Sequence, residues 1–196
     1  RIDAQIAKRT FRENPVIGKL LADLKASGKR LHLLGLVSDG GVHSHQRHLV
    51  ELATWAQDEW VPTTIHAILD GRDTAQKSAE GYLQWLQFQL RGCPSVKVGS
   101  ICGRYIAMDR DKRWERTERA WKLLVDGVGE FEAKDALAAI ATAYDRGETD
   151  EFVCPTKLAD FHPIQDGDGV IFFNFRADRA RQLCNAASLR PTARSC

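Results

Sequence analysis

The sequence predicts an α/β fold: a mainly parallel sheet with helices on both faces, built as a single domain. Three observations lead to this prediction. Apolar runs alternate with amphipathic segments along the chain, the pattern of strands joined by crossover helices. Four of the runs are long enough for buried strands, and each ends in a loop rich in glycine, aspartate, arginine or histidine. The chain has 196 residues, 43% of them hydrophobic, enough for one core without disulfides or metals.

The composition argues against several classes of protein. A formal net charge of +2 is too small to indicate nucleic acid or an anionic membrane as partner. No stretch approaches the roughly 20 apolar residues of a membrane-spanning helix, and no signal peptide opens the chain. The five cysteines are scattered without a C-x-x-C pair, which favours reduced thiols in the cytoplasm. Arginine supplies 18 of the 28 basic residues, a weak indication of small anionic ligands.

The first half of the chain is predicted to be a helix followed by two strand–helix units. Asn14 and Pro15 read as an N-cap and a first-turn proline, and Gly28 ends that helix. Strands are expected at residues 31–37 and 63–69, and each is followed by a helix, at residues 44–60 and 77–91.

The second half is predicted to add two further buried strands, at 95–102 and 169–175. Helices are expected at 111–126 and 135–147. Residues 150–156 are expected to form a short edge strand, because Pro155 would interrupt a central ladder.

Three regions are distinguished along the chain. Residues 1–13 are expected to be an N-terminal helix or linker, and residues 14–183 to form the domain. Residues 184–196 contain Pro191 and no apolar stripe, so a divergent or disordered tail is expected there. The first residue is Arg1, which suggests a piece of a longer polypeptide.

Polar side chains follow the ends of the four buried strands. Ligands of open α/β sheets bind beyond the carboxyl ends of parallel strands, so these side chains should share one crevice. Five arginines gathered there would repel one another unless an anion were bound, which predicts a site for a ligand carrying a phosphate and a carboxylate. The predicted site residues are His43, Arg72, Asp73, Arg104, Arg110, Arg176 and Arg179.

Other interpretations of these residues stay open. Asp70 stands before a glycine and reads as a turn former. Asp73 is a candidate proton-handling group, but it could instead cap the helix expected near Lys77. The spacing of His43, His45 and His48 imitates a metal site; the absence of a cysteine or carboxylate partner nearby disfavours it.

Four motifs closely resemble the cofactor-independent (2,3-bisphosphoglycerate-independent) phosphoglycerate mutases. They occur in order as "GLVSDGGVHSH", "LDGRDT", "GRYIAMDRDKRWER" and "FFNFRADRARQL". The resemblance extends from about residue 14 to residue 183, nearly the whole chain. It implies a glycolytic, cytoplasmic isomerase that interconverts 3-phosphoglycerate and 2-phosphoglycerate.

The resemblance also implies a second domain. In that family a phosphatase domain carries two manganese ions and a serine that becomes phosphorylated, and a phosphotransferase domain is inserted within it. This sequence resembles the insert, and the serine, the metal ligands and a substrate-contacting lysine have no counterpart in it. No cofactor is therefore expected in this chain, and its expected partners are the two phosphoglycerates and the phosphatase domain.

Carried over by motif, the resemblance assigns roles to the predicted site. His43 would contact the substrate phosphate, and Arg72 and Asp73 would hold the glycerate. Asp73 would exchange a proton with the attacking hydroxyl. The carboxylate and phosphate would be neutralised by Arg104, Arg110, Arg176 and Arg179.

The function expected is therefore the substrate-binding phosphotransferase domain of a phosphoglycerate mutase that works through a phosphoserine intermediate. The chain by itself is expected to be inactive. One alternative is a stand-alone module that binds phosphoglycerates or other small anions without catalysis. Another is a nucleic-acid-binding domain, which the nearly neutral charge disfavours.

Overall fold

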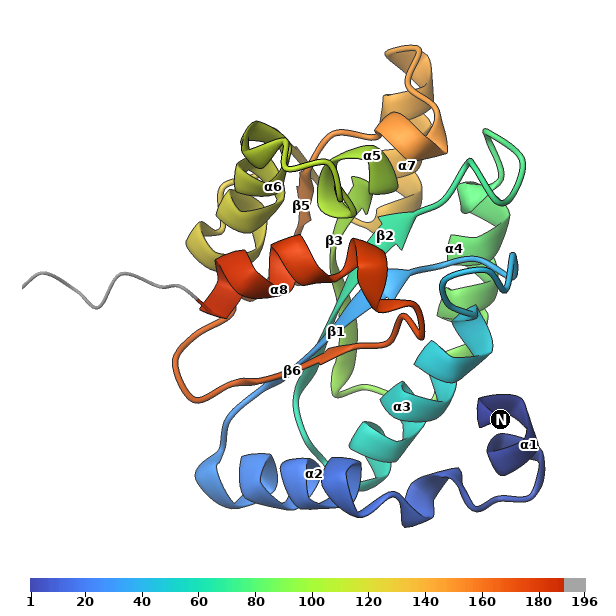
Figure 1. Ribbon diagram of the computed structural model, residues 1–196, viewed down its shortest axis with the longest axis vertical. Helices are drawn as coiled ribbons and strands as arrows, with labels where there is room; N and C mark the ends of the chain where they lie inside the picture. Colours follow the sequence, from blue (N-terminus) through green and yellow to red (C-terminus); the bar gives the residue numbers. More distant parts are fainter. Residues whose placement is uncertain (189–196) are drawn as a thin grey trace, which may run out of the picture.

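A six-stranded sheet forms the centre of the protein, in the order β4-β5-β3-β2-β1-β6 (Figure 1). The structure is a computed structural model that describes residues 1–188. Neighbouring strands in the series β3, β2, β1 and β6 are parallel, β5 runs antiparallel to β3, and β4 is parallel to β5. The strands are β1 Leu31–Leu36, β2 Thr63–Leu69, β3 Val96–Gly103, β4 Phe131–Ala133, β5 Thr156–Leu158 and β6 Gly169–Phe172.

Helices cover both faces of this sheet, as predicted. Successive residues of a strand point to opposite faces. Accordingly, Leu31 and Leu33 belong to one buried cluster, with α2, α3, α4 and α7, whereas Leu34 and Leu36 belong to a second, with α5, α6 and α8. The helices and helical turns are α1 Ile2–Ala7, η1 Phe11–Glu13, α2 Pro15–Ser27, α3 Gln46–Asp58, α4 Ala79–Gln89, α5 Arg104–Ala107, α6 Trp114–Trp121, η2 Lys122–Asp126, α7 Ala136–Asp145, η3 Asp150–Phe152, η4 Ala177–Arg179 and α8 Arg181–Ser188.

Local signals set the limits of α2 as the sequence predicts. The Asn14 side-chain oxygen accepts hydrogen bonds from the backbone N–H groups of Val16 and Ile17, at 3.0 and 3.2 Å. Gly28 ends the helix in the left-handed conformation, at φ 66°. The four predicted buried strands are all present, and they form the parallel series β3, β2, β1 and β6.

Two predicted elements differ in the structure. Residues 111–113 form a turn whose N–H groups, those of Asp111 and Arg113, donate to the Asp109 carboxylate at 3.0 Å, so α6 begins only at Trp114. The helix then continues as a π-helical turn, η2.

The predicted edge strand at 150–156 is wrong. Its first part is the 3-10 turn η3, and pairing begins only after Pro155, in β5, which lies between β4 and β3. The physical reason is that Asp150 is buried and caps α4 from a distance. Its Oδ2 accepts the backbone N–H groups of Ser78 and Ala79 at 2.8 and 2.9 Å.

The C-terminal part of the described chain is helical. α8 runs through residues 184–188, the beginning of the predicted tail, and the rest of that tail, 189–196, lies outside the described residues. Within residues 1–188, no helix has the length and apolar character needed to cross a membrane.

Candidate functional site

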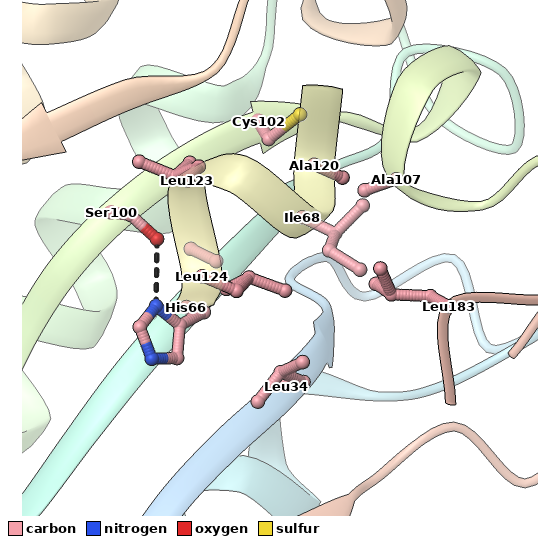
Figure 2. Close-up of a pocket in the computed structure, with 11 residues that line it drawn as sticks. Leu34, His66, Ile68, Ser100, Cys102, Ala107, Ala120, Leu123, Leu124 and Leu183 are labelled. Atoms are coloured by element: carbon pink, nitrogen blue, oxygen red, sulfur yellow. Dashed lines mark hydrogen bonds between the residues drawn. The ribbon is translucent and has the colours of Figure 1, made fainter. Parts of the chain in front are cut away.

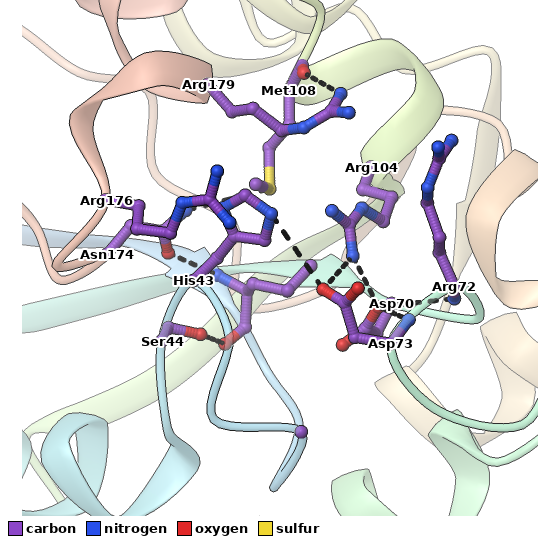
Figure 3. Close-up of polar contacts among 12 residues, drawn as sticks. His43, Ser44, Asp70, Arg72, Asp73, Arg104, Met108, Asn174, Arg176 and Arg179 are labelled. Atoms are coloured by element: carbon purple, nitrogen blue, oxygen red, sulfur yellow. Dashed lines mark hydrogen bonds and ion pairs between the residues drawn. The ribbon is translucent and has the colours of Figure 1, made fainter.

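The carboxyl ends of the strands β1, β2, β3 and β6 bring the predicted site residues together; Figure 3 labels all of them except Arg110. The loop after β1 contributes His43, the loop after β2 contributes Arg72 and Asp73, and Arg104 opens α5 directly after β3. The remaining arginines follow α5 and β6: Arg110, Arg176 and Arg179.

Arg104 is the buried anchor of the site, with only 2% of its surface exposed. Its Nη1 donates to Asp70 Oδ1 at 2.7 Å and to Asp73 Oδ2 at 2.6 Å. Asp70 also accepts the Ser38 hydroxyl at 2.7 Å and the backbone N–H of Asp73 at 3.0 Å. Burial opposes ionisation of Asp70, but these hydrogen bonds outweigh it and lower its pKa. Asp70 is therefore an ionised partner of Arg104 as well as the turn former predicted.

Asp73 is paired with Arg104 and not with its sequence neighbour Arg72. The Arg72 side chain is 58% exposed, and its Nη1 lies 3.6 Å from Glu151 Oε1. Gly71 permits this approach: at φ +68° it lies so close to η3 that an added Cβ would come within 2.8 Å of the Glu151 backbone nitrogen. Asp73 does not cap α4 either, because Asp150 caps that helix.

His43 lies between two carboxylates, with 5% of its side chain exposed. Its Nε2 is 3.9 Å from Asp73 Oδ2 and its Nδ1 is 4.0 Å from Asp178 Oδ1. Burial lowers the pKa of His43, and the positive charges of Arg104 and Arg176 lower it further. The imidazole is therefore neutral near pH 7 and can donate a hydrogen bond without adding charge.

The neighbouring histidines have different tasks. His45 Nδ1 accepts the backbone N–H of Arg47 at 3.2 Å and so caps α3. His48 Nε2 lies 2.9 Å from Asp3 Oδ1 of α1. Among the residues described, no three His, Cys, Asp or Glu side chains are grouped as a metal site would need.

Arg110 and Arg176 share one carboxylate. Asp178 Oδ2 lies 3.2 Å from Arg110 Nη1 and 3.3 Å from Arg176 Nη2. Burial opposes ionisation of Asp178, but the charge of Arg176 and the hydrogen bond from Arg110 outweigh it and lower its pKa. Both arginines therefore have a counter-ion already.

Arg179 differs from the other four. Its Nη1 donates to the Met108 carbonyl oxygen at 3.3 Å, and within residues 1–188 no carboxylate forms an ion pair with it. Burial and the like charges of Arg110, Arg104 and Arg72 lower its pKa. The expectation that five mutually repelling arginines require a bound anion is thus corrected: protein carboxylates pair with four of them, and Arg179 carries the uncompensated charge.

Several buried polar atoms of this site have no hydrogen-bond partner in the structure. A buried donor without a partner costs about 1–3 kcal/mol, so each such group calls for a bound water molecule, ion or ligand. These atoms are His43 Nδ1, Arg104 Nε, Asp178 Oδ1 and Arg179 Nε. The nitrogens of this set can be completed by a water molecule or by an anionic ligand, whereas Asp178 Oδ1 needs a donor.

A cavity on the α6–α8 face offers no competing site (Figure 2). Its lining is almost entirely apolar, and its one polar contact is His66 Nδ1 to Ser100 Oγ, at 2.8 Å. With a volume near 20 Å³ it has room for about one water molecule.

Sequence reasoning missed the residues that hold the site in place. The Ser38 hydroxyl fixes Asp70. The Oδ1 of Asn174 accepts the backbone N–H of Leu36 at 3.0 Å and joins the loop after β6 to the end of β1. Asp178 forms ion pairs with two arginines, Arg110 and Arg176. A polar residue directly after an apolar strand was the available signal for Ser38 and Asp70.

Comparisons with known proteins show which proteins this chain is similar to. The family model described as BPG-independent PGAM N-terminus matches residues 2–194. The 2,3-bisphosphoglycerate-independent phosphoglycerate mutase of Laribacter hongkongensis is 51% identical over 187 residues, covering 95% of this chain and 36% of that protein. That of Chromobacterium violaceum is 52% identical, with the same coverage. The chain thus spans little more than a third of the length of these relatives.

A solved structure shows the same fold. The crystal structure of Leishmania mexicana phosphoglycerate mutase at low cobalt concentration superposes with a TM-score of 0.88 at 28% identity. The match covers 99% of this chain and 38% of that one.

Proposed function

The chain belongs to the BPG-independent PGAM N-terminus family, and on that premise we propose that it is the substrate-binding phosphotransferase domain of a glycolytic phosphoglycerate mutase. Its substrates would be 3-phosphoglycerate and 2-phosphoglycerate. The observation that carries the proposal is the half-buried Arg179, a cation that forms no ion pair with a carboxylate among the described residues and that lies in one site with unpartnered nitrogens of Arg104 and His43. The seven predicted residues are the proposed binding set.

A phosphoglycerate suits this crevice chemically. It carries a phosphate, a carboxylate and a hydroxyl, and guanidinium groups bind both anions through paired, charge-assisted hydrogen bonds. A neutral His43 can donate to a phosphate oxygen. Asp73, held by Arg104 Nη1 at 2.6 Å, is the group proposed to take the proton of the attacking hydroxyl.

The rest of the reaction is assigned to the proposed phosphatase domain, the partner of this chain in the cytoplasm. The serine that accepts the phosphoryl group and the two manganese ions would belong to it. The residues described here would bind the glycerate, orient it and handle its hydroxyl proton. Holding the glycerate between the two phosphoryl transfers explains why so many charged groups surround a small ligand.

Arg179→Gln is expected to weaken binding of 3-phosphoglycerate to the 196-residue chain by roughly tenfold or more. The reason is that hydrogen bonds to charged groups contribute about 1.5–3 kcal/mol. The melting temperature should stay the same or rise, because the variant removes a half-buried cation that other arginines repel. Isothermal titration calorimetry and thermal denaturation provide the two measurements.

Arg12→Gln is the control for this test, because Arg12 pairs with Glu51 and Asp58 and belongs to no part of the crevice. Its affinity for 3-phosphoglycerate should match that of the unmodified chain. Absence of binding to the unmodified chain at millimolar concentrations, or unchanged affinity in Arg179→Gln, would contradict the proposal.

The purified chain is expected to bind phosphoglycerate without interconverting the two isomers, because the proposed phosphoryl acceptor lies outside it. A coupled mutase assay tests this. Measurable conversion of 3-phosphoglycerate to 2-phosphoglycerate by this chain would show that the crevice is a complete active site.

A further inference from the structure

Asp178 places a negative charge between two arginines of the proposed anion-binding site. Its Oδ2 contacts Arg110 and Arg176, and its Oδ1 is the carboxylate oxygen nearest to His43 Nδ1, at 4.0 Å. Each of the two arginines is 47% exposed and pairs with no other carboxylate in the described chain. A bound phosphate or carboxylate would seek the same contacts.

We propose that Asp178 is an internal competitor of the ligand: its carboxylate holds the anion position between Arg110 and Arg176 in the free protein and leaves it when the ligand binds. The proposal rests on the proposed function, which places a phosphoglycerate in this crevice. It makes Asp178 a specificity-determining residue in addition to an arginine partner.

The contacts of Asp178 make it the displaceable carboxylate of the site. Its side chain is 36% exposed, so solvent is directly available to it, and its buried Oδ1 has no hydrogen-bond partner to lose. Asp70 is the opposite case. Its side chain is 1% exposed, and it accepts hydrogen bonds from Ser38, Arg104 and the Asp73 backbone. Removing Asp70 from Arg104 would leave a buried charge unpaired, which is far more costly.

A displaceable carboxylate selects for ligands with two anionic groups. One group can bind the uncompensated Arg179 together with the unpartnered nitrogens of Arg104 and His43. The second must replace Asp178 between Arg110 and Arg176. A ligand with a single anionic group can satisfy the first position but is repelled by Asp178 and gains nothing at the second.

Asp178→Asn tests the proposal, because asparagine keeps the shape of the side chain and removes its charge. Titration calorimetry of the 196-residue chain at low ionic strength would compare inorganic phosphate and 3-phosphoglycerate as ligands. We expect the variant to bind both more tightly, on the order of tenfold, because the competing charge is gone. Asp178→Ala should behave alike. The control is Asp58→Asn, which causes the same change in net charge at an ion pair with Arg12 and should leave both affinities unchanged.

The possible outcomes separate this proposal from the proposed function. If the unmodified chain binds 3-phosphoglycerate and Asp178→Asn binds it equally or less tightly, Asp178 is a positioning residue and the competitor proposal is overturned. If neither the unmodified chain nor Asp178→Asn binds phosphate, the competitor proposal is overturned as well. If the unmodified chain fails to bind 3-phosphoglycerate but Asp178→Asn gains affinity for phosphate, the competitor is confirmed and the substrate assignment is contradicted.

Discussion

Asp73→Asn in a full-length phosphoglycerate mutase carrying this domain is expected to lose about 10²–10⁴-fold in turnover while nearly keeping its melting temperature. A hydroxyl that attacks a phosphoserine must lose its proton, and Asp73 is the carboxylate proposed to accept it. Asparagine can still accept the hydrogen bond of Arg104 through its amide oxygen, but it cannot take a proton. Arg104 also retains Asp70 as a buried counter-ion, at 2.7 Å.

The matched control for this experiment is Asp150→Ala. Asp150 caps α4 through Ser78 and Ala79, and it accepts the Tyr144 hydroxyl, so its loss should cost about 0.5–2 kcal/mol of stability or more. At a temperature where that variant remains folded, its turnover should be close to normal. Near-normal turnover in Asp73→Asn would assign the proton transfer to another group. A large loss of stability in that variant would make Asp73 a structural residue.

The free energy of unfolding is expected to fall steeply between pH 6.5 and pH 4. The cause is a buried polar chain across β3, β2, β1 and the turn before β6. Ser100 Oγ lies 2.8 Å from His66 Nδ1, His66 Nε2 lies 2.9 Å from His32 Nδ1, and His32 Nε2 lies 3.2 Å from Asp168 Oδ2. An ionised carboxylate can only accept, so His32 donates through Nε2 and accepts through Nδ1, and His66 does the same. Both imidazoles are neutral in this arrangement.

Burial determines how these histidines titrate. It lowers the pKa of His32 to about 4 although Asp168 opposes the shift, and it lowers the pKa of His66 well below the ordinary value. The unfolded chain binds protons near pH 6.5, where the folded protein does not, so acid favours the unfolded state. For His32 the stability present above pH 6.5 is lost as the pH falls to about 4, a change of about 3 kcal/mol.

Urea denaturation at pH 7 and at pH 4.5 measures this loss. His66→Gln should be less stable at pH 7, and its stability should depend less on pH, by up to about 1.4 kcal/mol per pH unit. His162→Gln serves as the control, since His162 is exposed and its substitution should leave most of the dependence in place. Equal stability of the unmodified chain at the two pH values would show that the two histidines are not held neutral by the fold.

Local sequence signals were sufficient for most of the fold. The apolar runs at 31–37 and 63–69 predicted buried strands, and both are strands in the structure. Asn14 and Gly28 predicted the two ends of α2, because each acts on backbone groups only a few residues away. Parallel strands have their carboxyl ends at the same edge of the sheet, so the predicted parallel order also predicted where the loops after these strands meet. His43, five arginines and Asp73 could therefore be placed at one edge of the sheet from the sequence.

Only the tertiary structure decided which charges pair within that crevice. Asp73 is next to Arg72 in sequence, yet it pairs with Arg104, 31 residues away, while Arg72 faces Glu151. The N-terminus of α4 is capped by Asp150, more than 70 residues further along the chain. A helix period or a cap depends on neighbouring residues and can be read locally. The choice of a guanidinium among several carboxylates depends on distances of a few ångströms and on burial, and these exist only after the strands and loops have packed.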